Sequence, residues 1–193
     1  MLSLEQRLEL LEADLAASPP RISAYEDLPF AILRYDPGED WTLRRRLRLQ
    51  SARLRARGKE LVTISLAALF WRSVEESEGL EALYALERER GFPAAEQQAN
   101  AYLSDPDWRP LSGLLEAELA KLDHRKHVAF IVRASVLSPT AYRVSALLDE
   151  MQGRSRVATI LCYPGTLEGT HGLRFMGLEH VEPLGNYRVK IYG

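Results

Sequence analysis

The sequence predicts an α/β fold, a three-layer sandwich in which helices cover both faces of a mostly parallel sheet of about five strands, with a helical middle section. Two observations support this fold. Short, nearly continuous apolar runs alternate with amphipathic helical patterns. Apolar residues make up 46% of the 193 residues and charged residues 27%, which are ordinary proportions for a folded domain. We therefore expect a single α/β domain over residues 1–193.

The first elements in order are a helix, a strand and a second helix. Leucines at three- and four-residue spacing predict an N-terminal helix over residues 1–18, which a Ser-Pro-Pro break ends. An apolar run predicts a strand over residues 29–35. After a short turn, a helix is expected from Asp40 to Gly58, with Gly58 as its C-cap.

The middle third is predicted to be helical. A strand over residues 59–65 leads into helices over residues 66–122, which break at Gly79, at Gly91 and at Asp105-Pro106. We interpret this helical section as an insertion or a crossover layer of the same domain.

The final third returns to strands. Strands are expected over residues 128–132 and 156–163, with a helix that opens at Ser138-Pro139-Thr140 between them. The last segment, residues 187–192, alternates polar and apolar side chains and predicts an edge strand.

Composition limits the compartment and the partners. A formal net charge of -2 argues against a protein that coats nucleic acid or an anionic membrane through bulk charge. Cys162 is the only cysteine, so no disulfide framework can form, and the charged N-terminus is unlike a secretion signal. No apolar run reaches the ~18 residues that a membrane span needs. These features predict a cytoplasmic protein without membrane contact.

The turn after the first strand lies where nucleotide-binding α/β proteins place phosphate-binding glycines. Here the turn has a single glycine, Gly38, and three nearby carboxylates, which would repel phosphate. A structural turn is the favoured interpretation. Asp36 stays a candidate site residue, because open α/β sheets bind ligands at the carboxyl ends of their strands.

Residues 163–175 form the segment richest in glycine. They predict a loop whose glycines serve turn geometry. The alternative is that backbone amides and a cationic side chain of this loop bind an anion. The candidate residues are Pro164, Gly165, Gly169 and Arg174.

No metal site, cofactor or catalytic residue is predicted. The four histidines lack metal-ligand spacing with cysteines or carboxylates, and no Gly-x-Ser-x-Gly motif occurs.

The helix that begins at Asp40 is rich in arginine. A 100° step places Leu43, Leu47 and Leu54 on one stripe, with arginines on both flanks. A solvated face is the favoured interpretation, and contact with an acidic protein surface or weak contact with nucleic acid are the alternatives. The candidate residues are Arg44, Arg45, Arg46, Arg48 and Arg53.

Several segments carry a family resemblance. They are the run 29–35, Pro139 with Arg143 and Leu147-Leu148, Tyr163-Pro164-Gly165, Leu173-Arg174-Phe175 and Asn186-Tyr187-Arg188. In this order they resemble the BrxB family of bacterial BREX phage-defence systems. The resemblance implies a cytoplasmic accessory protein that works with larger subunits, among them an ATPase, an adenine methyltransferase and a PglZ alkaline-phosphatase-like protein. It implies no known activity.

The leading interpretation is therefore a non-catalytic adaptor that binds another BREX-type protein, with the PglZ-like subunit as the expected partner. Interfaces favour Tyr and Arg at their centre, so Tyr187, Arg188 and Tyr192 of the expected edge strand are the candidate partner-binding residues. The alternative is a degenerate nucleotide- or nucleic-acid-binding module of the same defence system. A hydrolase or nuclease that uses Asp36 is the third interpretation.

Overall fold

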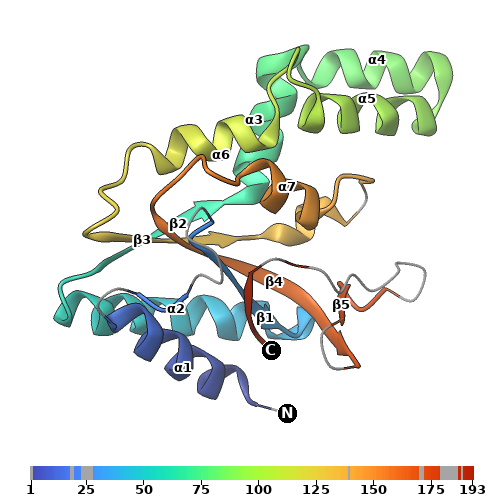
Figure 1. Ribbon diagram of the computed structural model, residues 1–193. Helices are drawn as coiled ribbons and strands as arrows, with labels where there is room; N and C mark the ends of the chain where they lie inside the picture. The colour runs from blue at the N-terminus through green and yellow to red at the C-terminus, as the bar shows by residue number, and fades with distance from the viewer. Residues whose placement is uncertain are drawn as a thin grey trace.

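The computed structural model describes residues 2–17, 20–22, 28–138, 140–169, 172–178, 187 and 189–193. Over these residues the chain forms a six-stranded sheet with helices on both faces (Figure 1). This arrangement confirms the predicted α/β sandwich with its mostly parallel sheet.

Five parallel strands form the body of the sheet. Side by side they are β2 (Glu60–Ser65), β3 (His127–Val132), β4 (Ala158–Glu168), β1 (Phe30–Tyr35) and β6 (Lys190–Tyr192). A further strand, β5 (Gly172–Phe175), pairs antiparallel with the end of β4. The inner strand β1, between β4 and β6, is buried along its whole length, while β2 and β6 are the edges of the parallel sheet.

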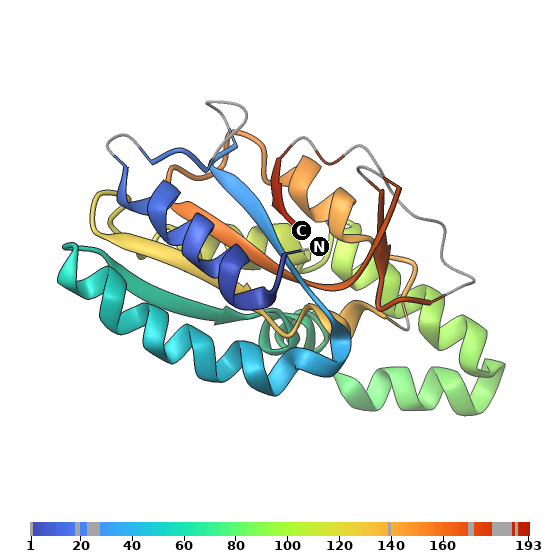
Figure 2. The same ribbon diagram turned by 90° about the horizontal axis from the view of Figure 1, so that it is seen from below.

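Two helices, α1 (Leu4–Ala16) and α2 (Asp40–Ala56), cover one face of the sheet (Figure 2). The predicted leucine stripe of α2 is confirmed, because Leu43, Leu47 and Leu54 are buried in the core on this face. α1 packs on β1 and β6, and α2 packs on β2. The two helices therefore lie toward opposite edges of the sheet.

The opposite face is covered by α3 (Leu66–Ser77), α6 (Leu111–Leu119) and α7 (Val144–Glu150). Between α3 and α6, the helices α4 (Leu80–Arg90) and α5 (Phe92–Ser104) form a hairpin that extends away from the sheet (Figure 1). The predicted helix breaks at Gly79 and Gly91 are present, and both glycines adopt a positive φ, which glycine tolerates best.

Several predicted boundaries are wrong. α2 ends at Ala56, two residues before Gly58, and Gly58 follows the cap residue with a φ of 75°, the left-handed conformation usual for a glycine at a helix end. The helix expected to open at residues 138–140 begins at Val144, because residues 134–137 form a 3-10 turn and the Thr140 hydroxyl donates to the Leu137 carbonyl, a local hydrogen bond that competes with helix. Pro139 lies outside the described residues. The last strand pairs with β1 only over Lys190–Tyr192.

Candidate functional site

The turn after β1 acts as a structural cap. The Asp36 carboxylate accepts a hydrogen bond from the Gly38 amide at 3.0 Å, and the Glu39 carboxylate accepts one from the Asp36 amide at 3.4 Å. This reciprocal capping satisfies amides that a phosphate would otherwise need. The contacts of Asp36 and Gly38 therefore support the interpretation as a structural turn.

The glycine-rich segment is a β-hairpin, so the prediction of a loop over residues 163–175 is wrong. Pro164 and Gly165 lie within β4, and Gly169, with φ 61°, lies in the turn before β5. A side chain at Gly165 would overlap the carbonyl oxygen of Arg174 on β5. Close approach of two strands, and not turn geometry, is what requires glycine at this position.

Arg174 is engaged within that hairpin. Its guanidinium forms a bidentate ion pair with Glu168, with Nη2 and Oε2 2.7 Å apart, and it donates to the Leu178 carbonyl at 3.2 Å. Hydrogen bonding to Arg174 lowers the pKa of the Glu168 carboxyl. Arg174, the cation of the alternative interpretation as an anion site, is paired with a carboxylate of its own hairpin.

Two buried arginines link the N-terminal helix to the centre of the sheet. Arg34 on β1 donates to the Gly165 carbonyl at 3.2 Å, and Arg7 on α1 donates to the Arg34 carbonyl. Burial lowers the pKa of both guanidinium groups, and the nearby Asp36 carboxylate opposes this effect. Sequence reasoning missed this pair. The signal in the sequence was Arg34, the one charged residue of the otherwise apolar β1.

The β6 edge is tied to α1. Tyr192 is only 5% exposed, and its hydroxyl donates to the Asp14 carboxylate at 2.7 Å, while the Lys190 ammonium lies 2.5 Å from the same carboxylate. Burial alone would raise the pKa of Asp14, but these hydrogen bonds outweigh it and lower the pKa. Tyr187 is partly buried and its hydroxyl donates to that of Tyr163 at 3.3 Å.

Two of the candidate partner-binding residues of this edge, Tyr187 and Tyr192, thus make contacts within the fold. The ring of Tyr192 lies in the core, and the hydroxyl of Tyr187 contacts a core tyrosine. Arg188 lies outside the described residues. Their role in partner binding stays a prediction.

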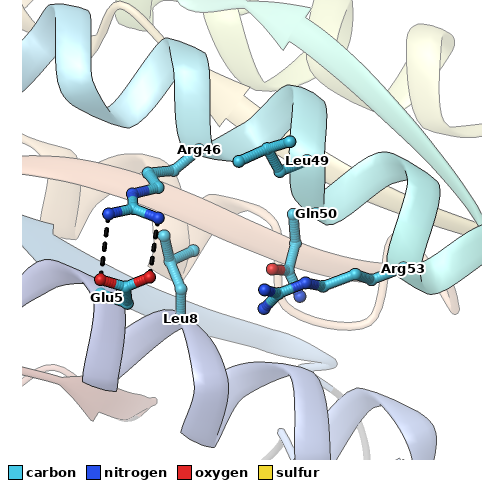
Figure 3. Close-up of a pocket in the computed structure, with 6 residues that line it drawn as sticks. All are labelled: Glu5, Leu8, Arg46, Leu49, Gln50 and Arg53. Carbon is cyan, nitrogen blue, oxygen red and sulfur yellow. Dashed lines mark hydrogen bonds and ion pairs between the residues drawn. The ribbon is translucent and has the colours of Figure 1, made fainter.

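The arginines predicted on α2 divide into two groups. Those of the first group pair with carboxylates, as Figure 3 shows for Arg46, whose two nitrogens lie 2.7 and 3.0 Å from the oxygens of Glu5. The other pairs are Arg44 with Asp40 at 2.7 Å and Arg53 with Glu12 at 3.6 Å. The second group is exposed and forms no ion pair with any described residue. It consists of Arg45 and Arg48, with Arg55 beside them.

We define the outer face of α2 as Trp41, Arg45, Arg48, Leu49 and Arg55, which are exposed and lie outside the buried stripe of the helix. Trp41 is 75% exposed and Leu49 is 55% exposed. Sequence reasoning missed Trp41, although its position opposite the leucine stripe was a signal. The outer face therefore carries two large apolar side chains beside guanidinium groups that form no ion pair with any described residue.

Between α1 and α2 lies a narrow gap lined by Glu5, Leu8, Arg46, Leu49, Gln50 and Arg53 (Figure 3). Its volume of about 10 Å³ admits at most one water molecule. It is a seam between packed helices and not a ligand site.

A larger cavity of about 320 Å³ opens beside the edge strand β2. Its lining comes from β2, from α3 and from the end of α6 with the residues that follow it. The lining includes apolar side chains and three charged ones, Arg72, Glu118 and Lys121. Arg72 and Lys121 share the Glu118 carboxylate, at 2.9 and 2.8 Å. Sequence reasoning missed this cavity, because strand order decides which strand lies at the edge.

Within the described residues, no group of three or more His, Cys, Asp or Glu side chains is arranged to hold a metal ion. His127 accepts a hydrogen bond from the Asp123 amide at 2.9 Å, a local contact. Cys162 is fully buried, and burial raises the pKa of its thiol. None of the helices that the structure describes has the length and apolar character needed to cross a bilayer.

Comparison with known proteins bears on the segment from β2 to β6. A family model described as BREX protein BrxB matches residues 62–191, about two thirds of the chain. No curated protein and no solved structure matches the chain. The matched residues include β2 from Val62 on and the residues that line its cavity, whereas α1, β1 and α2 precede them.

Proposed function

The chain belongs to the BrxB family of BREX phage-defence proteins, and from this premise we propose that it is a non-catalytic adaptor that binds a larger subunit of its defence system. The observation that carries the proposal is the outer face of α2. There, Trp41 and Leu49 are exposed beside three guanidinium groups that form no ion pair with any described residue. The proposal includes a cytoplasmic location.

The composition of this face is that of a protein-binding surface. Tryptophan and arginine are the residues most enriched among those that dominate binding energy at interfaces. The Arg44 guanidinium lies 5.0 Å from the Trp41 ring centroid and helps to orient the indole. A partner that covers this indole would remove a large apolar area from water, and its carboxylates would pair with the arginines.

The non-catalytic part of the proposal is supported by how the reactive residues are used. Asp36 caps a turn, Arg174 pairs with Glu168, and Cys162 is buried in the core. Each of these side chains has a structural contact that accounts for its presence.

The partner we propose is the PglZ-like subunit, which the BrxB resemblance makes the expected one among the BREX proteins. The test is to co-express the full chain with the other proteins of its BREX system and to purify it by an affinity tag. Wild type should retain the larger subunit. Trp41→Ala with Arg45→Glu should lower its recovery about ten-fold or more, because a lost hot spot costs ~2 kcal/mol or more.

A matched control changes an aromatic residue and an arginine four positions apart on another helix, as Trp41 and Arg45 are on α2. Tyr84→Ala with Arg88→Glu also removes an exposed aromatic ring and reverses an exposed arginine, on α4. This variant should bind as wild type does. Recovery of no BREX subunit by wild type would refute the adaptor function, and unchanged recovery by the α2 variant would refute the role of this face.

The free arginines also favour a second candidate function, nucleic-acid binding. Arg45, Arg48 and Arg55 could contact successive phosphates, and the affinity for duplex DNA would then fall steeply with salt. Arg45→Glu with Arg48→Glu would flatten that salt dependence. Wild type that shows no salt-dependent DNA binding in a fluorescence titration excludes this second function.

A further inference from the structure

The outer edge of β2 carries backbone hydrogen-bonding groups that no described strand pairs with. The Glu60 amide donates to the Lys126 carbonyl at 2.7 Å, which points Glu60 toward β3. Because these groups alternate in direction along a strand, the amides and carbonyls of Leu61 and Thr63 point outward. The sequence of β2 between Glu60 and Ser65 has neither Lys nor Pro, the residues that usually blunt an edge.

One side of this edge offers space for apolar side chains. The apolar part of the lining of the cavity of about 320 Å³ is Val62, Ile64, Leu69 and Leu122, and the charged part is Arg72, Glu118 and Lys121, which pair with one another. The cavity is roughly twice the ~150 Å³ that accommodates a benzene-sized group. A strand added to β2 would point every second side chain toward this cavity, which has room for more than one of them.

The other side of the edge is basic. Arg46, Gln50 and Arg53 face α1 across the seam of Figure 3, so the opposite flank of α2 faces the β2 edge. That flank carries Arg48 and Arg55, which are exposed and form no ion pair with any described residue. Side chains of an added strand that point toward α2 would meet these positive charges.

This charge distribution selects the occupant. If a second copy paired antiparallel through its own β2, the two α2 helices would lie on the same face, and their arginine flanks would face each other. The positive charges of the two flanks would then repel each other, which disfavours a second copy as the occupant. An acidic segment makes the opposite contact, since its carboxylates would pair with Arg48 and Arg55.

We propose that the β2 edge binds an extended segment of a partner protein in which acidic and apolar side chains alternate. The segment adds a strand to the sheet, with its apolar side chains in the cavity and its acidic side chains against α2. This inference rests on the adaptor function and adds the β2 edge to it as a second contact surface, which shares Arg48 and Arg55 with the outer face of α2.

The first test uses a short peptide in which Glu and Val alternate, titrated against the full chain by fluorescence anisotropy. The peptide should bind, and binding should weaken with salt, while a peptide in which Lys and Val alternate should not bind. Thr63→Pro removes an outward amide without removing a bond to β3, and it should weaken binding about ten-fold. His124→Pro, in an exposed turn, should leave binding unchanged.

A second variant covers the case in which Thr63→Pro does not fold, as circular dichroism would show. Arg48→Glu with Arg55→Glu should weaken binding of the acidic peptide by a similar factor. Arg88→Glu with Arg90→Glu on α4 is the matched control and should have no effect. Equal binding of the acidic and basic peptides, no binding of either, or insensitivity to both the proline and the arginine variants would overturn the proposal.

The second test uses the co-expressed BREX proteins and separates this inference from the adaptor function. Thr63→Pro should recover less of the larger subunit than wild type does. Wild-type recovery by Thr63→Pro, together with loss by the Trp41 variant, would keep the adaptor function and overturn strand addition. If wild type recovers no subunit, the adaptor function fails and the peptide titration alone decides what the edge binds.

Discussion

The two edge strands of the parallel sheet, β6 and β2, are protected in different ways. β6 is three residues long, carries Lys190, and is tied to α1 through the Asp14 carboxylate. β2 is six residues long, alternates between polar and apolar residues over most of its length, and borders a cavity. An edge that the fold protects by its own contacts contributes to stability, whereas an edge left open is available to a partner. β6 is therefore a structural edge, and β2 is the edge that we propose binds a partner.

The largest effect that this comparison predicts is on stability at β6. Tyr192→Ala removes a ring that is 5% exposed and should lower the free energy of unfolding by about 3 kcal/mol. Thr63→Ala at the exposed centre of β2 should change it by less than about 0.5 kcal/mol. Urea denaturation followed by circular dichroism measures both. Similar losses at the two positions would show that the β2 edge contributes to stability as much as the β6 edge does.

A smaller effect should depend on pH. Asp14→Asn weakens the bonds to Lys190 and Tyr192 and should cost about 2 kcal/mol at neutral pH. Because the folded state lowers the pKa of Asp14, this stabilisation is complete above the unfolded pKa of about 3.9 and is lost as pH falls through the folded pKa.

The gap between wild type and Asp14→Asn should therefore narrow below about pH 4 in urea denaturation, as the carboxylate takes up a proton. Asp149→Asn, at an exposed position on α7, is the control and should show no such change. A gap that stays constant down to the acid limit would mean that Asp14 does not hold the edge through its charge.

The smallest effect on the free energy of unfolding is expected for the arginines of α2. Arg46→Ala breaks an exposed bidentate pair with Glu5 on the α1 side and should cost about 0.5 kcal/mol. Arg48→Ala on the flank toward β2 should cost nothing measurable. A double-mutant cycle with Glu5→Ala, at low and high salt, measures the pair. A larger loss for Arg48→Ala would show that the flank has a structural role.

Local patterns predicted the elements better than their arrangement. The leucine stripe of α2 follows from helical periodicity, and the helix breaks at Gly79 and Gly91 follow from the conformational preference of glycine. The Pro164-Gly165 pair misled, because these residues are typical of turns but here lie in β4, where the approach of β5 requires glycine. Tertiary packing overrides turn chemistry at that point.

The candidate site was harder to predict than the fold. The burial of Tyr192 depends on Asp14, which precedes it by 178 positions in the chain, and no local pattern reports such a contact. The open edge at β2 depends on strand order, which periodicity does not contain. By contrast, the arginines of α2 were identified from sequence, and the structure only divided them into paired and free groups.

The contact between Asp14 and β6 also governs when the protein can fold during translation. Lys190 is synthesised 176 positions after Asp14, so α1 and β1 leave the ribosome long before the strand that completes their face exists. Contacts of such long sequence separation form late and slowly. Until then the nascent chain exposes the apolar residues of β1 to solvent, where chaperones can bind segments of this kind.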